Sequence, residues 1–208
     1  MSKLIGIFGG TFDPVHNGHI EIVVNLLRDI PFDEIRVVPN GTPPHRQSVG
    51  SINDRLKMVS LAFERIKKIT VDDREIRREG FSYAIDSAKE VLSEFKNDQI
   101  IWIMGSDAFL EIKLWHKWEE FLDLVNILVL TRPDSKIDKN SNIWDLISDR
   151  KISDIKLLKG SGKIMILNID PINISSTQVR SNIFKGKSVD NLIIEEVVDY
   201  IDEGKLYT

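Results

Sequence analysis

Two runs dominated by apolar residues constrain the fold of this chain more than any other feature. Residues 99–104 and 126–130 are each about as long as one strand and are bounded by turns and helical patterns. Such runs are typical of parallel strands that are covered on both faces. Because strand and helix patterns alternate along the chain, the sequence predicts an α/β fold: a Rossmann-like, doubly wound, open parallel sheet with helices on both faces. In this class, ligands bind at the carboxyl ends of the strands, near the topological switch point.

The remaining hydrophobic patterns place the other elements. Apolar or β-branched runs predict strands at residues 3–8, 34–38, 70–72, 99–104, 126–130 and 163–167. Helical spacing of apolar residues predicts helices at 20–27, 53–67, 85–95, 176–184 and 192–203. Residues 74–83 are charged and expected to be irregular, and the polar stretch 133–162 is expected to be an excursion with a short helix. We expect one domain over residues 1–208, with a small C-terminal helical part at about 175–204.

Composition excludes several classes of protein. The 208 residues include no cysteine, which excludes thiol catalysis, thiolate zinc sites and disulfides. The net charge of -4 argues against a general nucleic-acid-binding surface, so any anion site must be built locally. The apolar runs are far shorter than the ~20 residues of a membrane span, and the N-terminus lacks the zones of a signal peptide. We therefore expect a cytoplasmic protein that binds neither nucleic acid nor membrane; a homo-oligomer is left open.

The segment 9–19, GGTFDPVHNGH, carries the strongest indication of function. Two glycines after a strand allow a tight turn and close approach to a ligand, and the helix expected to begin near Asn17 points its free N–H groups at the loop, which favours a phosphate. His16 and His19 lie on one side of a first helical turn, where imidazoles can donate hydrogen bonds to phosphoryl oxygens. Each residue alone also fits a plain turn, an Asn cap or a surface histidine. Two of the chain's four histidines here favour the phosphate site.

Other known binding motifs fit residues 9–19 poorly. It is neither a GxGxxG dinucleotide fingerprint nor a P-loop, which argues against hydride transfer and P-loop hydrolysis. His16, His19 and Asp13 could coordinate zinc only with a further ligand from elsewhere, and no HExxH pattern is present. Zinc is therefore a minor alternative.

The chain resembles the nucleotidyltransferase superfamily whose signature is a glycine loop followed by His-x-Gly-His, and within it the bacterial nicotinate-nucleotide adenylyltransferase family. The motifs that carry the resemblance are GGTFDPVHNGH at 9–19, PNGTPPHR at 39–46, EIRREGFSYAID at 75–86, WIMGSDAF at 102–109, LWHKW at 114–118, TRP at 131–133, ISSTQVR at 174–180 and the terminal GKLY. The resemblance implies a single nucleotidyltransferase domain that transfers the adenylyl group of ATP to nicotinate mononucleotide. The products are nicotinate adenine dinucleotide and pyrophosphate, a step in NAD biosynthesis, formed by direct in-line attack on the α-phosphorus.

The resemblance also assigns residues to ATP and to catalysis. His16, His19 and Arg180 are the implied catalytic residues, with Arg180 in the first turns of a helix capped by Ser175 or Ser176. The implied ATP-binding residues are Gly9, Gly10, Thr11, Phe12, Gly18, Gly105, Asp107, Ser175, Ser176 and Thr177. Asp107 could also cap the helix that follows its strand. Mg2+ is implied as the ion that neutralises the ATP phosphates, and Asp13 could hold one of its water ligands.

A second set is implied for nicotinate mononucleotide. Its members are Asn40, His45, Arg46, Ser82, Tyr83, Ala84 and Trp115. The loop that ends in His45-Arg46 would bind the 5′-phosphate, and Trp115 would stack on the pyridine ring. Backbone N–H groups near Tyr83 and Ala84 would meet the carboxylate. The family commonly has threonine at the position of Ala84, so a hydroxyl contact there would be missing while a backbone contact would survive.

Two alternatives remain. One is a related adenylyl- or cytidylyltransferase that acts on phosphopantetheine, nicotinamide mononucleotide or a phosphorylated polyol; the PPHR and LWHKW segments argue against it. The other is a non-catalytic nucleotide sensor, against which His16, His19 and Arg180 argue because a binder needs no transition-state donors. Release of pyrophosphate distinguishes the two.

Overall fold

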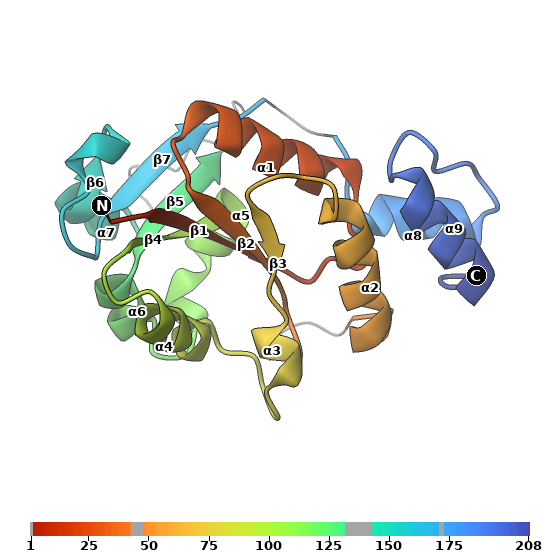
Figure 1. Ribbon diagram of the computed structural model, residues 1–208, viewed down its shortest axis with the longest axis horizontal. Coiled ribbons are helices and arrows are strands. Elements are labelled where there is room, and N and C mark those ends of the chain that lie inside the picture. The colour runs from red at the N-terminus through yellow and green to blue at the C-terminus, as the bar shows by residue number, and fades with distance from the viewer. Residues whose placement is uncertain (1, 43–47, 132–142, 171–172) are drawn as a thin grey trace. The chain divides into compact units, whose positions relative to one another are not determined.

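A computed structural model describes residues 2–42, 48–131, 143–170 and 173–208 (Figure 1). It confirms the predicted α/β, Rossmann-like class, with a seven-stranded parallel sheet in the order β3-β2-β1-β4-β5-β7-β6. The strands are β1 (Leu4–Gly10), β2 (Glu34–Pro39), β3 (Ile69–Val71), β4 (Gln99–Gly105), β5 (Asn126–Thr131), β6 (Lys151–Ile152) and β7 (Ile164–Asn168). The strand order reverses between β1 and β4, which makes this the topological switch point of the fold.

The helices agree with most of the predicted segments. They are α1 (Asn17–Asp29), α2 (Ile52–Phe63), α3 (Arg74–Arg77), α4 (Ala84–Glu94), α5 (Ser106–Leu110), α6 (Trp118–Leu124), α7 (Trp144–Arg150), α8 (Ser176–Phe184) and α9 (Glu195–Gly204), with 3-10 turns at Ile112–Leu114 and Ile155–Leu157. Among the described residues, no helix is long and apolar enough to cross a membrane.

Two expectations about the elements were wrong, and a short strand was not predicted. Residues 74–83 are not wholly irregular, because the charged α3 forms there. Helix α2 ends at Phe63 rather than at 67. The polar excursion contains, besides its short helix α7, the two-residue edge strand β6, which pairs with β7 through the main chain and therefore needs no apolar pattern of its own.

The chain forms two compact units. The first unit comprises residues 1–9, 30–34 and 83–171. Its strands β1, β4, β5 and β7 pair in parallel, and all six residues of β5 are buried, as the apolar run predicted. Helices α4 and α6 lie side by side (Figure 1), joined by an exposed ion pair in which Lys89 Nζ is 2.7 Å from Glu120 Oε1. The single domain expected from the sequence stays a prediction.

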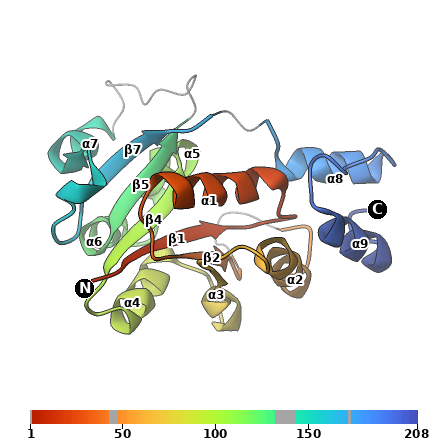
Figure 2. The ribbon, with the colours of Figure 1, turned by 45° about the horizontal axis from the view of Figure 1, so that its top comes forward.

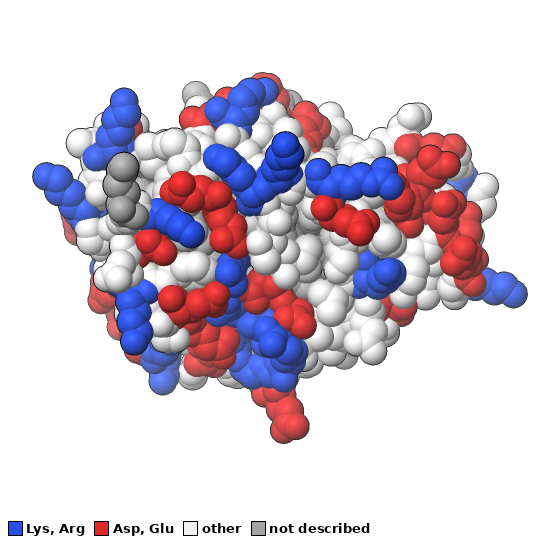
Figure 3. Space-filling view, in the orientation of Figure 1, with Lys and Arg blue, Asp and Glu red and all other residues white. Residues whose placement is uncertain are grey.

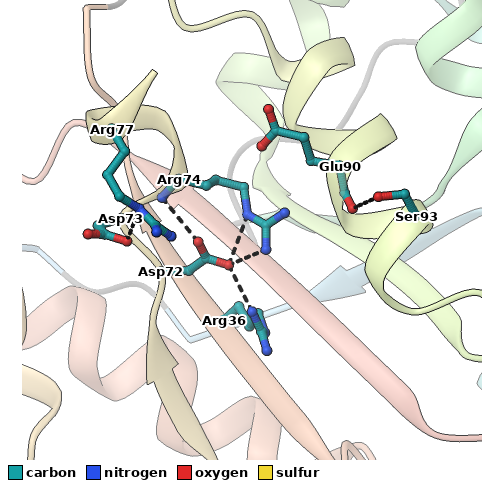
Figure 4. Close-up of polar contacts among 7 residues, drawn as sticks. All are labelled: Arg36, Asp72, Asp73, Arg74, Arg77, Glu90 and Ser93. Atoms are coloured by element: carbon teal, nitrogen blue, oxygen red, sulfur yellow. Dashed lines mark hydrogen bonds and ion pairs between the residues drawn. The ribbon is translucent and has the colours of Figure 1, made fainter. Parts of the chain in front are cut away.

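The second unit comprises residues 10–29, 35–82 and 172–208. In it, α2 lies against β3 and against α9, the latter pair shown in Figure 2. The Tyr200 hydroxyl of α9 donates a hydrogen bond of 2.8 Å to Asp54 of α2. After β3, the buried Asp72 accepts hydrogen bonds from both Arg36 of β2 and Arg74 of α3 (Figure 4). Burial raises the pKa of Asp72, but the bonds from Arg74 and Arg36 outweigh burial and lower it. This ion cluster holds α3 at the end of the strand.

The surface carries charges of both signs. Basic and acidic side chains are interspersed over most of the face drawn in Figure 3. This distribution agrees with a net charge of -4 and with the expectation that an anion site is built from local groups.

Candidate active site

The turn after β1 depends on one glycine and on the aromatic side chain that follows it. Phe12 is buried and has a left-handed backbone with φ of 49°. A Cβ at Gly10 would lie 2.9 Å from the Phe12 ring, so the close packing of this ring requires glycine. The ring also packs edge-on against the His19 imidazole, with centroids 4.9 Å apart. Phe12, predicted to contact ATP, is therefore a buried support of the loop.

His16 and His19 lie together at the start of α1. Their rings are stacked, with centroids 3.7 Å apart. The backbone N–H of His16 donates to Nδ1 of His19 over 3.2 Å, while the N–H of His19 donates to the carbonyl of His16 over 2.8 Å. The first bond corresponds to one half of a capping box, with imidazole in place of a carboxylate, and the second is a main-chain turn. Because Nδ1 of His19 accepts a hydrogen bond, its proton in the neutral form lies on Nε2, which becomes a hydrogen-bond donor.

Burial keeps both imidazoles neutral. It lowers the pKa of His16 to about 4. Burial, with a smaller contribution from His16, also lowers the pKa of His19 well below its ordinary value. Within the part of the chain that the structure describes, Nδ1 of His16 is buried and makes no hydrogen bond. At neutral pH, these side chains therefore act as neutral hydrogen-bond donors and not as fixed positive charges.

Asp13 is the buried centre of the loop. Its carboxylate accepts hydrogen bonds from Val49 N, Gly50 N and the Tyr207 hydroxyl, at 2.7, 3.0 and 2.7 Å. A Cβ at Gly50 would come within 2.7 Å of Asp13 Oδ1 and of the Tyr207 hydroxyl oxygen. Both carboxylate oxygens accept protein hydrogen bonds, which hold Asp13 in place, and its expected contact to a magnesium-bound water stays a prediction. The described residues contain no group of three or more side chains that could hold a metal ion.

Arg55 of α2 is a site residue that the sequence analysis missed. Its side chain is fully buried and donates to the carbonyls of Thr11 and Gly41 over 2.8 and 2.9 Å. Burial lowers the pKa of Arg55, and the charge of Asp13 raises it. Arg55 thus connects the loop after β1 with the loop after β2. An arginine within a helix of mixed charge gives no sequence signal of such a role.

Helix α8 contacts the same loop. The side chain of Ser175 accepts from Gln178 N, which confirms the predicted helix cap. The Ser176 hydroxyl donates to the Pro14 carbonyl over 2.8 Å, and Arg180 donates to the Asp13 carbonyl and, over 3.5 Å, to the Thr177 hydroxyl. The implied catalytic residues His16, His19 and Arg180 therefore meet in one unit. Gly18 is buried in α1, and Gly9 ends β1 together with Gly10.

The loop after β2 holds the next group of predicted residues. Asn40 donates its N–H to the Gly10 carbonyl over 2.9 Å. The Ser82 hydroxyl accepts from the N–H groups of Gly41 and Thr42, at 3.0 and 3.2 Å, and so holds the loop in place. The predicted phosphate ligands His45 and Arg46 lie outside the described residues.

The other unit contains the remaining predicted residues. Gly105 is the N-cap of α5, and Asp107 lies exposed in the first turn. Asp107 is therefore not the cap, which was the alternative reading. A Cβ at Gly105 would lie 2.5 Å from Asp107 Oδ1, so glycine allows this carboxylate to lie close to the backbone.

Aromatic residues form a second cluster in that unit. Tyr83 is the N-cap of α4 and makes no side-chain capping bond, and Ala84 begins the helix. The Tyr83 ring contacts the ring of His116 at a centroid distance of 4.5 Å, a neighbour that the sequence analysis did not single out. Trp115 is half-buried and packs at 5.6 Å against Phe121 of α6. Trp115 can therefore offer an aromatic face while its other contacts hold it in place.

Comparison with known proteins agrees with this geometry. The model of the cytidylyltransferase-like family matches residues 7–182. The chain belongs to this family. It is 40% identical over 210 residues to the "Probable nicotinate-nucleotide adenylyltransferase" of Pseudomonas aeruginosa (strain UCBPP-PA14), covering 100% of this chain and 98% of the relative. A relative of the same name from Pseudomonas putida (strain GB-1) is 39% identical over 208 residues, covering 99% and 95%.

Solved structures share the fold. The nicotinic acid mononucleotide adenylyltransferase of Plasmodium falciparum, complexed with NaAD, superposes with a TM-score of 0.77 at 22% identity, covering 99% of this chain and 97% of the other. A putative nicotinate-nucleotide adenylyltransferase from Vibrio parahaemolyticus gives a TM-score of 0.67 at 16% identity, covering 99% and 95%. At these identities, the likeness supports the fold only, and the chemistry has to be argued from the residues of the site.

Proposed function

We propose that this chain is a nicotinate-nucleotide adenylyltransferase, which joins ATP and nicotinate mononucleotide into nicotinate adenine dinucleotide and releases pyrophosphate. The observation that carries the proposal is the pair of stacked, neutral imidazoles at the N-terminus of α1, directly after a glycine turn. The full-length identity of 40% to relatives of that name supports the choice of substrates. We also propose a cytoplasmic location, as expected for an enzyme that uses ATP.

The reaction needs positioning more than covalent chemistry. A phosphate oxygen of nicotinate mononucleotide attacks the α-phosphorus of ATP in line; the new P–O bond forms as the bond to the pyrophosphate leaving group breaks. Negative charge grows on the transferring group, and donors aimed at it lower the barrier. Nε2–H of His19, fixed by the bond at Nδ1, and His16 supply such donors. Arg180, half-buried beside the same loop, is suited to the β- and γ-phosphates.

The aromatic cluster suits the pyridine nucleotide. Because Tyr83 does not cap α4 with its side chain, the first N–H groups of that helix can meet a carboxylate, and the helix dipole favours the negative charge. This contact needs no side chain at position 84, so Ala84 is compatible with selection of the acid. Trp115 provides the face for the ring.

Mg2+ enters the proposal as the ion that accompanies the ATP phosphates. The described residues contain no group of three or more side chains that could hold a metal ion, and the water-mediated contact to Asp13 stays a proposal. Mg2+ commonly keeps several waters and binds mainly through substrate phosphates. No step is therefore assigned to the ion.

The test is release of pyrophosphate from ATP and Mg2+, with nicotinate mononucleotide, nicotinamide mononucleotide and phosphopantetheine offered separately. We expect strong preference for the nicotinate nucleotide. Preference for the amide would keep the mechanism and refute the carboxylate site at α4. A folded, ATP-binding protein with no turnover on any of the three would replace the proposal with a nucleotide sensor.

A further inference from the structure

The tail that follows α9 reaches the centre of the histidine loop. Helix α9 ends in a left-handed turn at Lys205, where the N–H of Leu206 donates to the Ile201 carbonyl over 2.9 Å. Tyr207 is then also left-handed, with φ of 65°. Its hydroxyl lies 2.7 Å from Oδ1 of Asp13. This conformation costs free energy for a residue other than glycine, so it persists only where surrounding contacts hold it.

The hydroxyl of Tyr207 is bound to the loop as a donor. Burial, the hydrogen bond to Asp13 and the charge of Asp13 raise the pKa of Tyr207 far above its ordinary value. The proton therefore stays on the hydroxyl at any pH at which the enzyme works. A hydrogen bond from a neutral hydroxyl to a buried carboxylate is among the stronger kinds in proteins.

The Tyr207 hydroxyl and the Asp13 carboxylate are closely surrounded by other groups. Gly50 donates its N–H to the same oxygen of Asp13, and a Cβ at that position would come within 2.7 Å of both the carboxylate and the hydroxyl. The adjacent main chain is held too, because Arg180 binds the Asp13 carbonyl and Ser176 binds the Pro14 carbonyl. The Tyr207 bond is thus one of a few that fix the loop immediately before the histidines.

We propose that Tyr207 is a positioning residue for adenylyl transfer: its hydroxyl holds Asp13 so that His16 and His19 face the reacting phosphate. His16 is only three residues beyond Asp13, and the intervening Val15 is buried. In this proposal, loss of the Tyr207 bond shifts Asp13 and, through the short main chain between Asp13 and α1, the stacked imidazoles. The activity part of this inference rests on the proposed function.

The chain offers a matched control for the experiment. Tyr200 also donates to a carboxylate over 2.8 Å, but its acceptor is Asp54 at the start of α2. Tyr207→Phe and Tyr200→Phe each remove one hydroxyl from the C-terminal part, and only the first touches Asp13. Gly50→Ala is a second variant, since it keeps the hydroxyl and places a Cβ within 2.7 Å of both oxygens of this hydrogen bond.

We expect Tyr207→Phe to lower kcat about tenfold with little change in KM for either nucleotide, because small displacements of catalytic groups cost up to about 100-fold. Gly50→Ala should also lower kcat with little change in KM, and Tyr200→Phe should keep the wild-type kcat. In NMR spectra without substrate, the imidazole signals of His16 and His19 should shift in the first two variants and not in the third.

Three outcomes would overturn the inference. The first is a Tyr207→Phe variant with wild-type kcat and wild-type imidazole signals. The second is an equal loss of kcat in Tyr207→Phe and Tyr200→Phe. The third is a Tyr207→Phe variant in which KM changes and kcat does not. If the wild-type chain fails to release pyrophosphate, the proposed function is wrong, while the imidazole signals still decide whether Tyr207 positions the histidines. Should Tyr207→Phe fail to fold, Gly50→Ala supplies the same comparison.

Discussion

The loop around Asp13 and the aromatic cluster around Trp115 are held in different ways. In the first, Asp13, His16 and Arg55 are 5%, 7% and 0% exposed, and short hydrogen bonds fix the backbone. In the second, Tyr83 and Trp115 are half-buried and rest on ring contacts of 4.5 and 5.6 Å. Hydrogen bonds are directional, whereas ring contacts tolerate sliding. The first arrangement suits groups that must meet a transition state, and the second suits groups that bind a substrate.

The largest expected effect tests whether the loop depends on its buried cation. Arg55→Met keeps the volume but removes two hydrogen bonds and the positive charge beside Asp13. We expect a loss of about 3 to 5 kcal/mol in the free energy of unfolding, because two buried carbonyls lose their donor and the charge of Asp13 loses a nearby countercharge. Urea unfolding measures it.

The control for this variant is Arg65→Met. The side chain of Arg65 is 82% exposed and pairs with Glu196, so its loss should cost less than about 1 kcal/mol. Similar losses in the two variants would contradict the special role of the buried arginine.

The next prediction concerns turnover. His19→Ala should lower kcat by at least ~100-fold while the protein stays folded, because it removes one donor to the transferring phosphoryl group. Glu21→Ala, on an exposed position of the same helix, should leave kcat unchanged. Steady-state pyrophosphate release measures both variants, and near-normal turnover of His19→Ala would refute the assignment of this loop to catalysis.

Acid should weaken the histidine loop specifically. The folded-state pKa of His16 is about 4, below the ordinary value of 6.5, so between these two pH values the unfolded chain binds more protons than the folded one. The stability due to His16 is therefore complete above pH 6.5 and is lost as pH falls towards 4, by about 3 kcal/mol. The lowered pKa of His19 acts in the same direction.

Urea unfolding at several pH values between 7 and 4 checks this prediction. His16→Asn should show a shallower decline than the wild-type chain, since it lacks one of the two groups. A wild-type stability that does not change over this range would show that the imidazoles are not buried as described.

The smallest effect is expected in the aromatic cluster. Trp115→Ala should raise KM for nicotinate mononucleotide about tenfold and leave kcat nearly unchanged, because stacking on a base is worth about 1 to 3 kcal/mol. Trp115→Phe should restore part of the affinity, and Trp118→Phe, which changes the neighbouring tryptophan, should have the wild-type KM. A fall in kcat as large as that of His19→Ala would remove the contrast between the two regions.

Much of the fold was predictable because local patterns decide it. Continuous apolar runs predicted β4 and β5, and helical spacing predicted α4 and α8 at nearly their observed bounds. The edge strand β6 was not predictable, since it has only two residues and pairs through its backbone. The charged α3 was missed for a related reason, because its stability comes from the contacts of Asp72 and not from an apolar face.

The candidate site divides in the same way. The residue types after β1 were evident from the sequence, since two glycines and two histidines three apart have few other uses together. The supporting roles of Arg55 and Tyr207 depend on the folded structure, because these residues come from α2 and from the tail after α9, far along the chain from Asp13. The folded structure also sets the state of the imidazoles: burial, which depends on the packing of the whole unit, keeps them neutral.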